Sequence, residues 1–325
     1  MEYFHRVDFF CMPEKFTNSL SLSTCWNSHR HEDGLSLLEE CATLGFEWVE
    51  LSHGIRKSLL SGIFEGVKRN IVRISSVHHS LPLPVGFSSA APNAYEFSDG
   101  DAHRHEKAER LTLETIDHAA EVGAKAVVVH MGSTGQSAVT SQLFSLLRKG
   151  QFGSRKYVQL KLNAVLEHEK RFCSIWPQVR GHLLKCAEHA NKYGIKLGLE
   201  CREKIEEIPM DSLWPEIFAE MPDNVGYWHD FGHAGLKETL GFVDSLALWQ
   251  KWKHRLIGCH VHDIVGLNRD HSALGEGRIS FESYWEFLNG SSPLFVLELS
   301  PHVTKQKVKE SLLWWRAHGY SAGSR

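Results

Sequence analysis

The chain has 325 residues, and its 36 lysine and arginine side chains nearly balance 39 aspartates and glutamates, giving a formal net charge of −3. This balance argues against a protein that binds nucleic acid or an anionic membrane through bulk electrostatics. Histidine is abundant, with 21 residues against 7 tyrosines, although the sequence contains no histidine-rich tract.

The segment Met1 to Phe16 mixes charged with apolar residues, so no secretory signal is predicted there. No apolar run approaches the roughly 20 residues that span a bilayer. The seven cysteines are odd in number and form no CxxC pair, which favours reduced thiols. We therefore expect a cytoplasmic protein that does not contact a membrane.

Short apolar runs alternate with longer amphipathic stretches from about residue 18 to residue 318, as is typical of repeated β-α units. The predicted strands are Leu20–Thr24, Trp48–Leu51, Val72–Val77, Ala126–Val129, Lys196–Leu199, Val225–Trp228, Leu256–Val261 and Leu294–Leu299. Eight strands are the number of an α/β barrel. No GxGxxG or Walker A sequence is present, so a doubly wound nucleotide fold is disfavoured and no nucleotide cofactor is expected.

Helical patterns lie between these strands, and glycine follows several of them near the position of a C-cap. The predicted helices are Gly34–Thr43, Ala102–Val122, Val179–Tyr193, Ser212–Met221, Leu236–Trp252, Phe281–Leu288 and Thr304–His318. The sequence therefore predicts one domain over residues 1–325, a (β/α)8 TIM barrel of the α/β class.

One connection, after the fourth strand, is unusually long and covers about residues 131–177. It contains four glycines and a basic cluster between Arg148 and Lys161. Long loops at the catalytic end of a barrel often act as functional caps, so a cap-like insertion is one interpretation. The alternative is a solvated insertion with helical segments.

Histidines and carboxylates recur where the predicted strands end, which is where the active sites of α/β barrels lie. These residues are His53, His78, His79, His130, Glu200, His229, Asp230, His233, His260, His262, His271 and Glu298. Neutral imidazoles together with carboxylates are ligands for Zn²⁺, Mn²⁺ or Co²⁺, and the absence of cysteine clusters disfavours a purely structural zinc. The pattern therefore predicts a divalent metal ion in the mouth of the barrel.

Five segments in order resemble the xylose isomerase-like TIM barrels, a family of sugar isomerases, sugar epimerases and the endonuclease IV group. They are Leu197-Gly198-Leu199-Glu200, His229-Asp230-Phe231-Gly232-His233, His260-Val261-His262-Asp263, Asp270-His271-Ser272-Ala273-Leu274-Gly275-Glu276-Gly277 and Leu297-Glu298. The resemblance extends over about residues 18 to 318.

The resemblance implies a ligand set and a reaction. It implies that Glu200, Asp230, His260 and Glu298 hold one divalent ion. Of these, Glu200 and Glu298 would move a proton between the two faces of the carbon next to a carbonyl, because paired carboxylates in different environments can act as acid and base. Candidate substrate contacts are Arg202, His233 and His271, although Arg202 could equally pair with Glu203 or Glu206.

The endonuclease IV group implies a different outcome, namely a trinuclear zinc cluster that cleaves DNA beside an abasic site. By motif, His78, His130, His233 and His271 match further ligands of that cluster. Where that group has an aspartate two residues before the last of these histidines, this chain has Arg269, with Asp270 displaced by one position. Because arginine cannot ligate a metal, the third ion is expected only if the loop is shifted.

The sequence thus favours a metal-dependent sugar or sugar-phosphate isomerase or epimerase that acts on a small sugar or polyol. A zinc phosphodiesterase or abasic-site nuclease, a lyase or dehydratase acting on a keto-sugar or inositol, and a non-catalytic binding barrel stay open. A nucleic-acid partner is disfavoured but not excluded. The identity of the sugar, the number of metal ions and the oligomeric state are not determined by the sequence.

Overall fold

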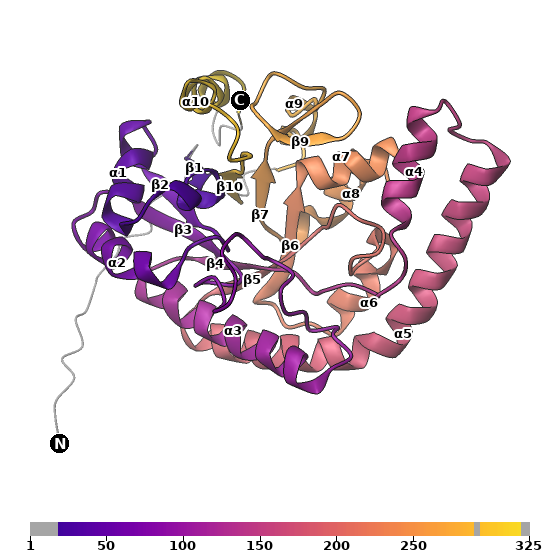
Figure 1. The fold of residues 1–325 in the computed structure, drawn as a ribbon, viewed down its shortest axis with the longest axis horizontal. Coiled ribbons are helices and arrows are strands. Elements are labelled where there is room, and N and C mark those ends of the chain that lie inside the picture. The colour runs from indigo at the N-terminus through magenta and orange to yellow at the C-terminus, as the bar shows by residue number, and fades with distance from the viewer. Residues whose placement is uncertain (1–18, 289–292, 320–325) are drawn as a thin grey trace.

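The computed structural model describes residues 19–288 and 293–319. Eight parallel strands close into a barrel in chain order, as Figure 1 shows. They are β1 (Leu20–Ser23), β2 (Trp48–Leu51), β3 (Arg73–His78), β4 (Ala126–Val129), β5 (Lys196–Glu200), β6 (Val225–Asp230), β7 (Leu256–Val261) and β10 (Leu294–Leu297). The predicted (β/α)8 barrel is confirmed, and every predicted strand is found with ends that differ by at most two residues.

The strands form because their apolar runs are buried on both faces. All four residues of β4 are buried, and β10 closes the barrel by pairing with β1 in the register Leu20 with Phe295. Inside the barrel, a small apolar cluster of Ala126, Val128, Trp228, Leu294 and Val296 is separate from the large core between strands and helices. This inner cluster includes the Trp228 ring, whose centroid lies 5.3 Å from that of His260.

The helices follow the predicted order. They are α1 (Gly34–Thr43), α2 (Leu60–Lys68), α3 (Ala102–Glu121), α4 (Val139–Arg148), α5 (Arg155–Lys192), α6 (Trp214–Ala219), α7 (Phe231–Thr239), α8 (Ser245–Trp252), α9 (Glu282–Trp285) and α10 (Lys305–His318). The helix α2 was not predicted. The predicted helix Leu236–Trp252 is wrong as a single element, because Gly241 adopts a positive φ of 68° and Asp244 caps a new helix by accepting the Ala247 N–H.

The insertion after β4 is largely helical. The helix α4 and the first half of the 38-residue α5 form a hairpin that projects at the right of Figure 1. A second hydrophobic cluster joins the hairpin to the barrel, where Leu143 and Tyr157 pack with Leu236 and Leu240. The Tyr157 hydroxyl also donates to the Leu240 carbonyl at 2.9 Å. The insertion therefore consists of helical segments, as the second interpretation expected. Its role as a cap stays a prediction.

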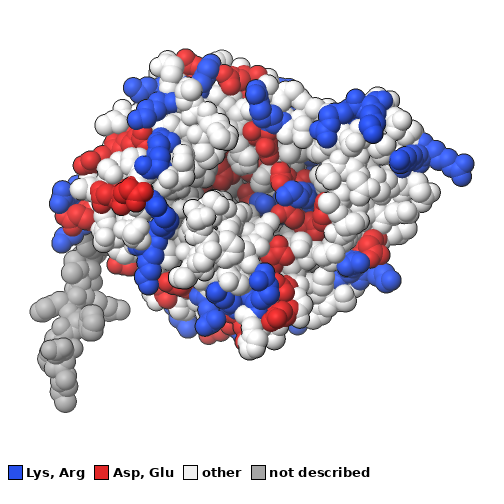
Figure 2. All heavy atoms as spheres, viewed as in Figure 1, with Lys and Arg blue, Asp and Glu red and all other residues white. Residues whose placement is uncertain are grey.

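A β-hairpin of β8 (Asp263–Val265) and β9 (Arg269–Ser272) follows β7 and carries Asp270 and His271 toward the mouth of the barrel. Charges of both signs are spread over the face drawn in Figure 2, with several basic side chains over the projecting hairpin. Among the described residues, no helix is long and apolar enough to cross a membrane.

The six cysteines within the described residues, Cys25, Cys41, Cys173, Cys186, Cys201 and Cys259, are free thiols, as predicted. Cys11 and the segment Met1 to Phe16, for which no secretory signal was expected, lie outside the described residues.

Candidate metal centre

A cavity of about 260 Å³ opens at the carboxyl ends of the strands. It is lined by His53, His78, Pro92, His130, Glu200, Arg202, Glu203, His233, Asp270, His271 and Glu298. All eight residues that the sequence offered as metal ligands or catalytic groups lie in this cavity or directly beneath it, since Asp230 and His260 are fully buried below its floor. The candidate substrate contact Arg202 lines it as well.

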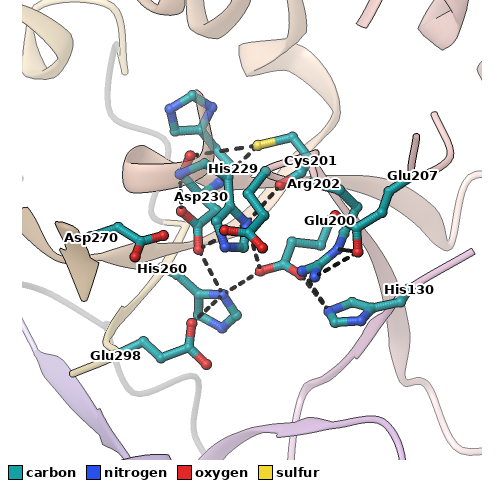
Figure 3. A network of polar contacts seen from close by, with 12 residues as sticks. His130, Glu200, Cys201, Arg202, Glu207, His229, Asp230, His260, Asp270 and Glu298 are labelled. Carbon is teal, nitrogen blue, oxygen red and sulfur yellow. Dashed lines mark hydrogen bonds and ion pairs between the residues drawn. The ribbon is translucent and has the colours of Figure 1, made fainter. Parts of the chain in front are cut away.

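The four predicted ligands converge on one point. Glu200 ends β5, Asp230 ends β6, His260 lies on β7, and Glu298 follows β10. The Nδ1 atom of His260 lies 2.7 Å from Glu200 Oε1, 3.2 Å from Glu298 Oε2 and 3.5 Å from Asp230 Oδ2. Figure 3 shows the three carboxylates arranged around this nitrogen. One ligand atom from each residue lies within 4.8 Å of the others.

This donor set fits a divalent cation. Ligand atoms held at about 2.0–2.2 Å from a metal ion lie about 3 Å from one another, which is close to the three distances from His260 Nδ1 to the carboxylate oxygens. Three buried carboxylates around one imidazole also carry a desolvation cost that a cation between them would offset. Carboxylate oxygens and one imidazole nitrogen suit Zn²⁺, Mn²⁺ or Co²⁺. The four residues could therefore hold one such ion.

Asp230 is placed by the turn from β6 into α7. It caps the helix, with Oδ1 accepting the N–H of His233 at 2.7 Å, so its carboxylate points back toward the mouth. The ring of His262 supports it with Nε2 3.1 Å from Oδ1. Burial would lower the pKa of His262, but the Asp230 carboxylate outweighs burial and raises that pKa to about 9.

A buried network of ion pairs surrounds Glu200. Its carboxylate contacts the Arg202 guanidinium and lies 2.6 Å from His130 Nε2. Arg202 also contacts Glu207 with Nη2 3.1 Å from Oε1, so its salt bridges are to Glu200 and Glu207 and not to Glu203 or Glu206. Burial alone would raise the pKa of Glu200, but Arg202 and His130 outweigh it and hold that pKa well below its ordinary value.

Glu298 has the opposite environment. Burial raises its pKa to about 7, and the nearby carboxylates of Glu200, Glu50 and Asp230 add to this against the lowering effect of His260. Within one site, the pKa of Glu200 is therefore lowered and the pKa of Glu298 is raised relative to an ordinary glutamate. Such separation is typical of an acid and base pair.

Three histidines on one side of the mouth are held neutral by burial. Burial lowers the pKa of His53 to about 3, and it also lowers the pKa values of His78 and His130. The Nδ1 atom of His78 lies 2.9 Å from the His79 carbonyl, and that of His130 lies 2.9 Å from Asn93 Oδ1. Both Nε2 atoms therefore face Glu200, at 3.9 Å and 2.6 Å respectively.

The hairpin after β7 shapes the other side of the mouth. His271 stacks on His262 with ring centroids 4.0 Å apart, and its Nδ1 lies 3.1 Å from the Glu298 carbonyl. One ligand atom from each of His233, Asp270 and His271 lies within 4.8 Å of the other two. The side chain beside these two histidines is therefore Asp270, whereas Arg269 is exposed. This is the arrangement that a third metal ion was expected to need, with an aspartate shifted by one position along the loop.

His79 and His229 are two of the strand-end histidines that do not line the cavity. His229 is buried away from the mouth, where Nδ1 lies 2.9 Å from the Tyr227 hydroxyl and the ring packs on Trp249. His79 stacks on Phe97. Alternation along a strand explains both, because neighbouring side chains point to opposite faces.

The sequence analysis missed three residues of the site. Glu50, Asn93 and Glu207 all contact predicted site residues through hydrogen bonds or ion pairs. For Glu50 a signal existed, because a glutamate within the apolar run Trp48–Leu51 is rare on a buried strand.

Comparisons with known proteins agree on one fold. A family model described as "Xylose isomerase-like TIM barrel" matches residues 38–318. An uncharacterized protein, y4fM, of Sinorhizobium fredii is 22% identical over 246 residues, which cover 75% of this chain and 68% of that protein.

Solved structures are similar over nearly their whole length. A D-tagatose 3-epimerase-like protein superposes with a TM-score of 0.66 at 19% identity, covering 92% of this chain and 96% of that one. A 3-keto-D-glucoside 4-epimerase, YcjR, from E. coli gives 0.63 at 15% identity, with 92% and 99% covered. At these identities the likeness shows a shared fold.

Proposed function

The chain belongs to the xylose isomerase-like TIM barrel family, and from that premise we propose that it is a divalent-metal-dependent isomerase or epimerase of a small sugar or sugar phosphate. The observation that carries the proposal is the pair Glu200 and Glu298, which face the same His260 nitrogen with pKa values moved in opposite directions. Similar folds in proteins named as sugar epimerases support the substrate class.

The two glutamates have the properties that a proton transfer between opposite faces of one carbon requires. Glu200 is held as a carboxylate by Arg202 and His130, so it can accept a proton. Glu298 faces the same His260 nitrogen from the end of β10 and can take the opposite role in the transfer, and a bound cation would lower the raised pKa of its free carboxyl. A divalent cation held by Glu200, Asp230, His260 and Glu298 would acidify a C–H bond next to a carbonyl by stabilising the charge that develops on the oxygen.

The remaining side chains of the cavity suit a polyhydroxylated substrate. His53, His78, His233 and His271 line its walls and offer imidazole donors and acceptors. The Nδ1 atom of His53 is buried without a hydrogen-bond partner among the described residues, so it is available to a substrate hydroxyl. We also propose that the enzyme is a single domain and that it lies in the cytoplasm, which the six free thiols among the described residues support.

The test is proton exchange in deuterated buffer. The protein loaded with Mn²⁺ is incubated with a panel of ketohexoses and their phosphates in D₂O, and NMR follows deuterium uptake beside the carbonyl and the appearance of an epimer or isomer. We expect uptake that requires the metal and is lost in Glu298→Gln. The control Glu109→Gln, at a half-buried glutamate of α3 that contacts His182 of α5, should keep wild-type activity. Loss of water from the substrate instead would identify a lyase or dehydratase.

One observation favours a second candidate, an abasic-site nuclease. His233, Asp270 and His271 form a further group with metal-ligand spacing. That candidate predicts two or three zinc ions per chain and nicking of a duplex that contains an abasic site. A nicking assay with the zinc-loaded protein separates the two functions.

A further inference from the structure

We propose that Glu50 is a positioning residue that fixes the ring of His260 so that its Nδ1 lone pair faces the three carboxylates of the candidate metal centre. The inference rests on the proposed function, because it assigns to Glu50 a role toward the same metal ion. No earlier step of the proposed reaction uses this residue, and it lies outside the group of four ligands.

Glu50 is a fully buried charge in the interior of the barrel. It lies on β2, and the strand register pairs it with Ser23 of β1 and Ser76 of β3. Both serine hydroxyls donate to its carboxylate, Ser23 Oγ to Oε1 at 3.1 Å and Ser76 Oγ to Oε2 at 2.7 Å. The two neighbouring strands therefore hold the carboxylate in one orientation.

A third contact of this carboxylate is the ring of His260. The Nε2 atom of His260 lies 3.2 Å from Oε1 and 3.4 Å from Oε2 of Glu50. A carboxylate is an acceptor only, so Nε2 carries a hydrogen and donates it. In a metal-bound neutral imidazole the other nitrogen, Nδ1, then offers its lone pair.

The geometry divides the carboxylates around His260 into two sets. Glu200, Asp230 and Glu298 surround Nδ1 within 3.5 Å, whereas Glu50 lies at the opposite edge of the ring. A ligating histidine commonly donates its second N–H to a carboxylate, and removal of such a partner lowers metal affinity about 10- to 100-fold. Glu50 matches that partner in chemistry and in position.

Burial explains why this contact matters energetically. His260 and Glu50 are both fully buried, so bulk solvent does not reach the contact between them. Without it, Nε2–H loses its acceptor and the alternative tautomer, with the hydrogen on Nδ1, is no longer disfavoured. The metal would then have to compete with that proton.

The experiment measures metal affinity rather than turnover. Wild type, Glu50→Ala and Glu50→Gln are titrated with Mn²⁺ by calorimetry. We expect Glu50→Ala to bind about 10- to 100-fold more weakly, while Glu50→Gln, whose amide oxygen still accepts from Nε2–H, stays within a few-fold of wild type. Asp211→Asn is the matched control, since it neutralises another buried carboxylate, paired with Lys237 outside the ligand group, and leaves the affinity unchanged.

A second readout reports the tautomer itself. In ¹⁵N-histidine-labelled protein loaded with Zn²⁺, NMR should show a hydrogen on Nε2 of His260 and none on Nδ1, with the signal assigned by its loss in His260→Gln. Equal Mn²⁺ affinity of wild type and Glu50→Ala, or a hydrogen on Nδ1, overturns the role of Glu50. If wild type itself binds no Mn²⁺ or Zn²⁺, the metal dependence in the proposed function fails, and the role of Glu50 toward the metal fails with it.

Discussion

The guanidinium of Arg202 lies against the ring of His130, with Nη1 2.8 Å from Nε2, and the same nitrogen contacts the carboxylate of Glu200. A fixed positive charge thus lies against both side chains, which would otherwise be free to face a cation. Because like charges repel strongly at such distances in a buried site, Arg202 disfavours a metal ion between His130 and Glu200.

The first prediction concerns metal stoichiometry. We expect one tightly held divalent ion per chain after loading and desalting, bound by the group around His260 Nδ1. Elemental analysis against protein concentration measures it. Two or three equivalents per chain would contradict the prediction and favour the nuclease.

The second prediction concerns Arg202 itself. Arg202→Met leaves the buried carboxylates of Glu200 and Glu207 without their cation, so we expect a loss of about 3–5 kcal/mol in the free energy of unfolding. Urea denaturation of the metal-free protein measures the loss. Arg202→Lys keeps the positive charge but loses the planar guanidinium that contacts two carboxylates at once. Its free energy of unfolding should therefore lie between those of wild type and Arg202→Met. A methionine variant as stable as wild type would show that the network contributes nothing.

The third prediction concerns the proton donor. Glu298→Gln removes the group whose pKa is raised to about 7, and we expect kcat to fall about 10²- to 10⁴-fold while the protein still folds. Steady-state kinetics with the substrate identified by exchange measures this, and circular dichroism checks the fold. Metal occupancy must be measured in the same sample, because Glu298 is also a candidate ligand. A fully loaded variant with undiminished kcat would show that Glu298 moves no proton.

The fourth prediction concerns pH. His168 is buried in α5, where Nδ1 lies 2.8 Å from the Ile205 carbonyl and Nε2 accepts the Met210 N–H at 3.3 Å. Burial lowers its pKa from 6.5 to about 4, so the folded protein favours the neutral ring and the unfolded chain takes up the proton first. The stabilisation is therefore fully present above about pH 6.5 and is lost as the pH falls toward 4.

The measurement compares wild type with His168→Gln, whose amide can keep both hydrogen bonds but does not titrate. The difference in unfolding free energy between wild type and His168→Gln should shrink by about 2 kcal/mol when the pH falls from 7.5 to 5. At pH 5 the ring is largely protonated in the unfolded chain, where its pKa is 6.5, but largely neutral in the folded protein, where its pKa is about 4. Urea denaturation at both pH values gives the difference. If the difference in unfolding free energy between the two proteins does not change with pH, His168 does not contribute to the pH dependence of stability.

The fifth prediction concerns the floor of the barrel. A Cβ at Gly258 would lie 2.4 Å from Trp228 Cζ3 and 2.9 Å from the Leu294 carbonyl oxygen. Gly258→Ala should therefore destabilise the protein by about 1–3 kcal/mol through overpacking. Gly181→Ala is the matched control, since nothing lies within 4 Å of its Cβ in the middle of α5. There, alanine should stabilise the helix by about 0.5–1 kcal/mol. Changes of the same sign in both variants would contradict the packing argument.

Much of the fold could be predicted because burial and local geometry leave direct marks on a sequence. Apolar runs such as Ala126–Val129 are buried on both faces of a parallel barrel, so they appear without alternation. The candidate ligands Glu200, Asp230 and Glu298 could be located because they end such runs, and parallel strands bring their ends to one rim.

Helix boundaries were harder to predict because amphipathic periodicity continues across short turns. The pattern over Leu236–Trp252 contains a break at Gly241 that depends on a positive φ and on the cap supplied by Asp244. The long α5 passes through Pro177, where a sequence argument expects a boundary. Packing of α5 against neighbouring elements overrides that local preference.

The sequence by itself determined the barrel and the rim on which the site lies, and the family resemblance pointed to His260 and the three carboxylates that surround its Nδ1. Only the tertiary structure decided which partners surround them. Closure of the barrel aligns Glu50 with Ser23 and Ser76 and points it at His260. The path of the loops places Arg202 against Glu200 and Glu207. The physical reason is that periodicity encodes which face of an element is buried, whereas contacts between distant side chains depend on register, closure and loop path.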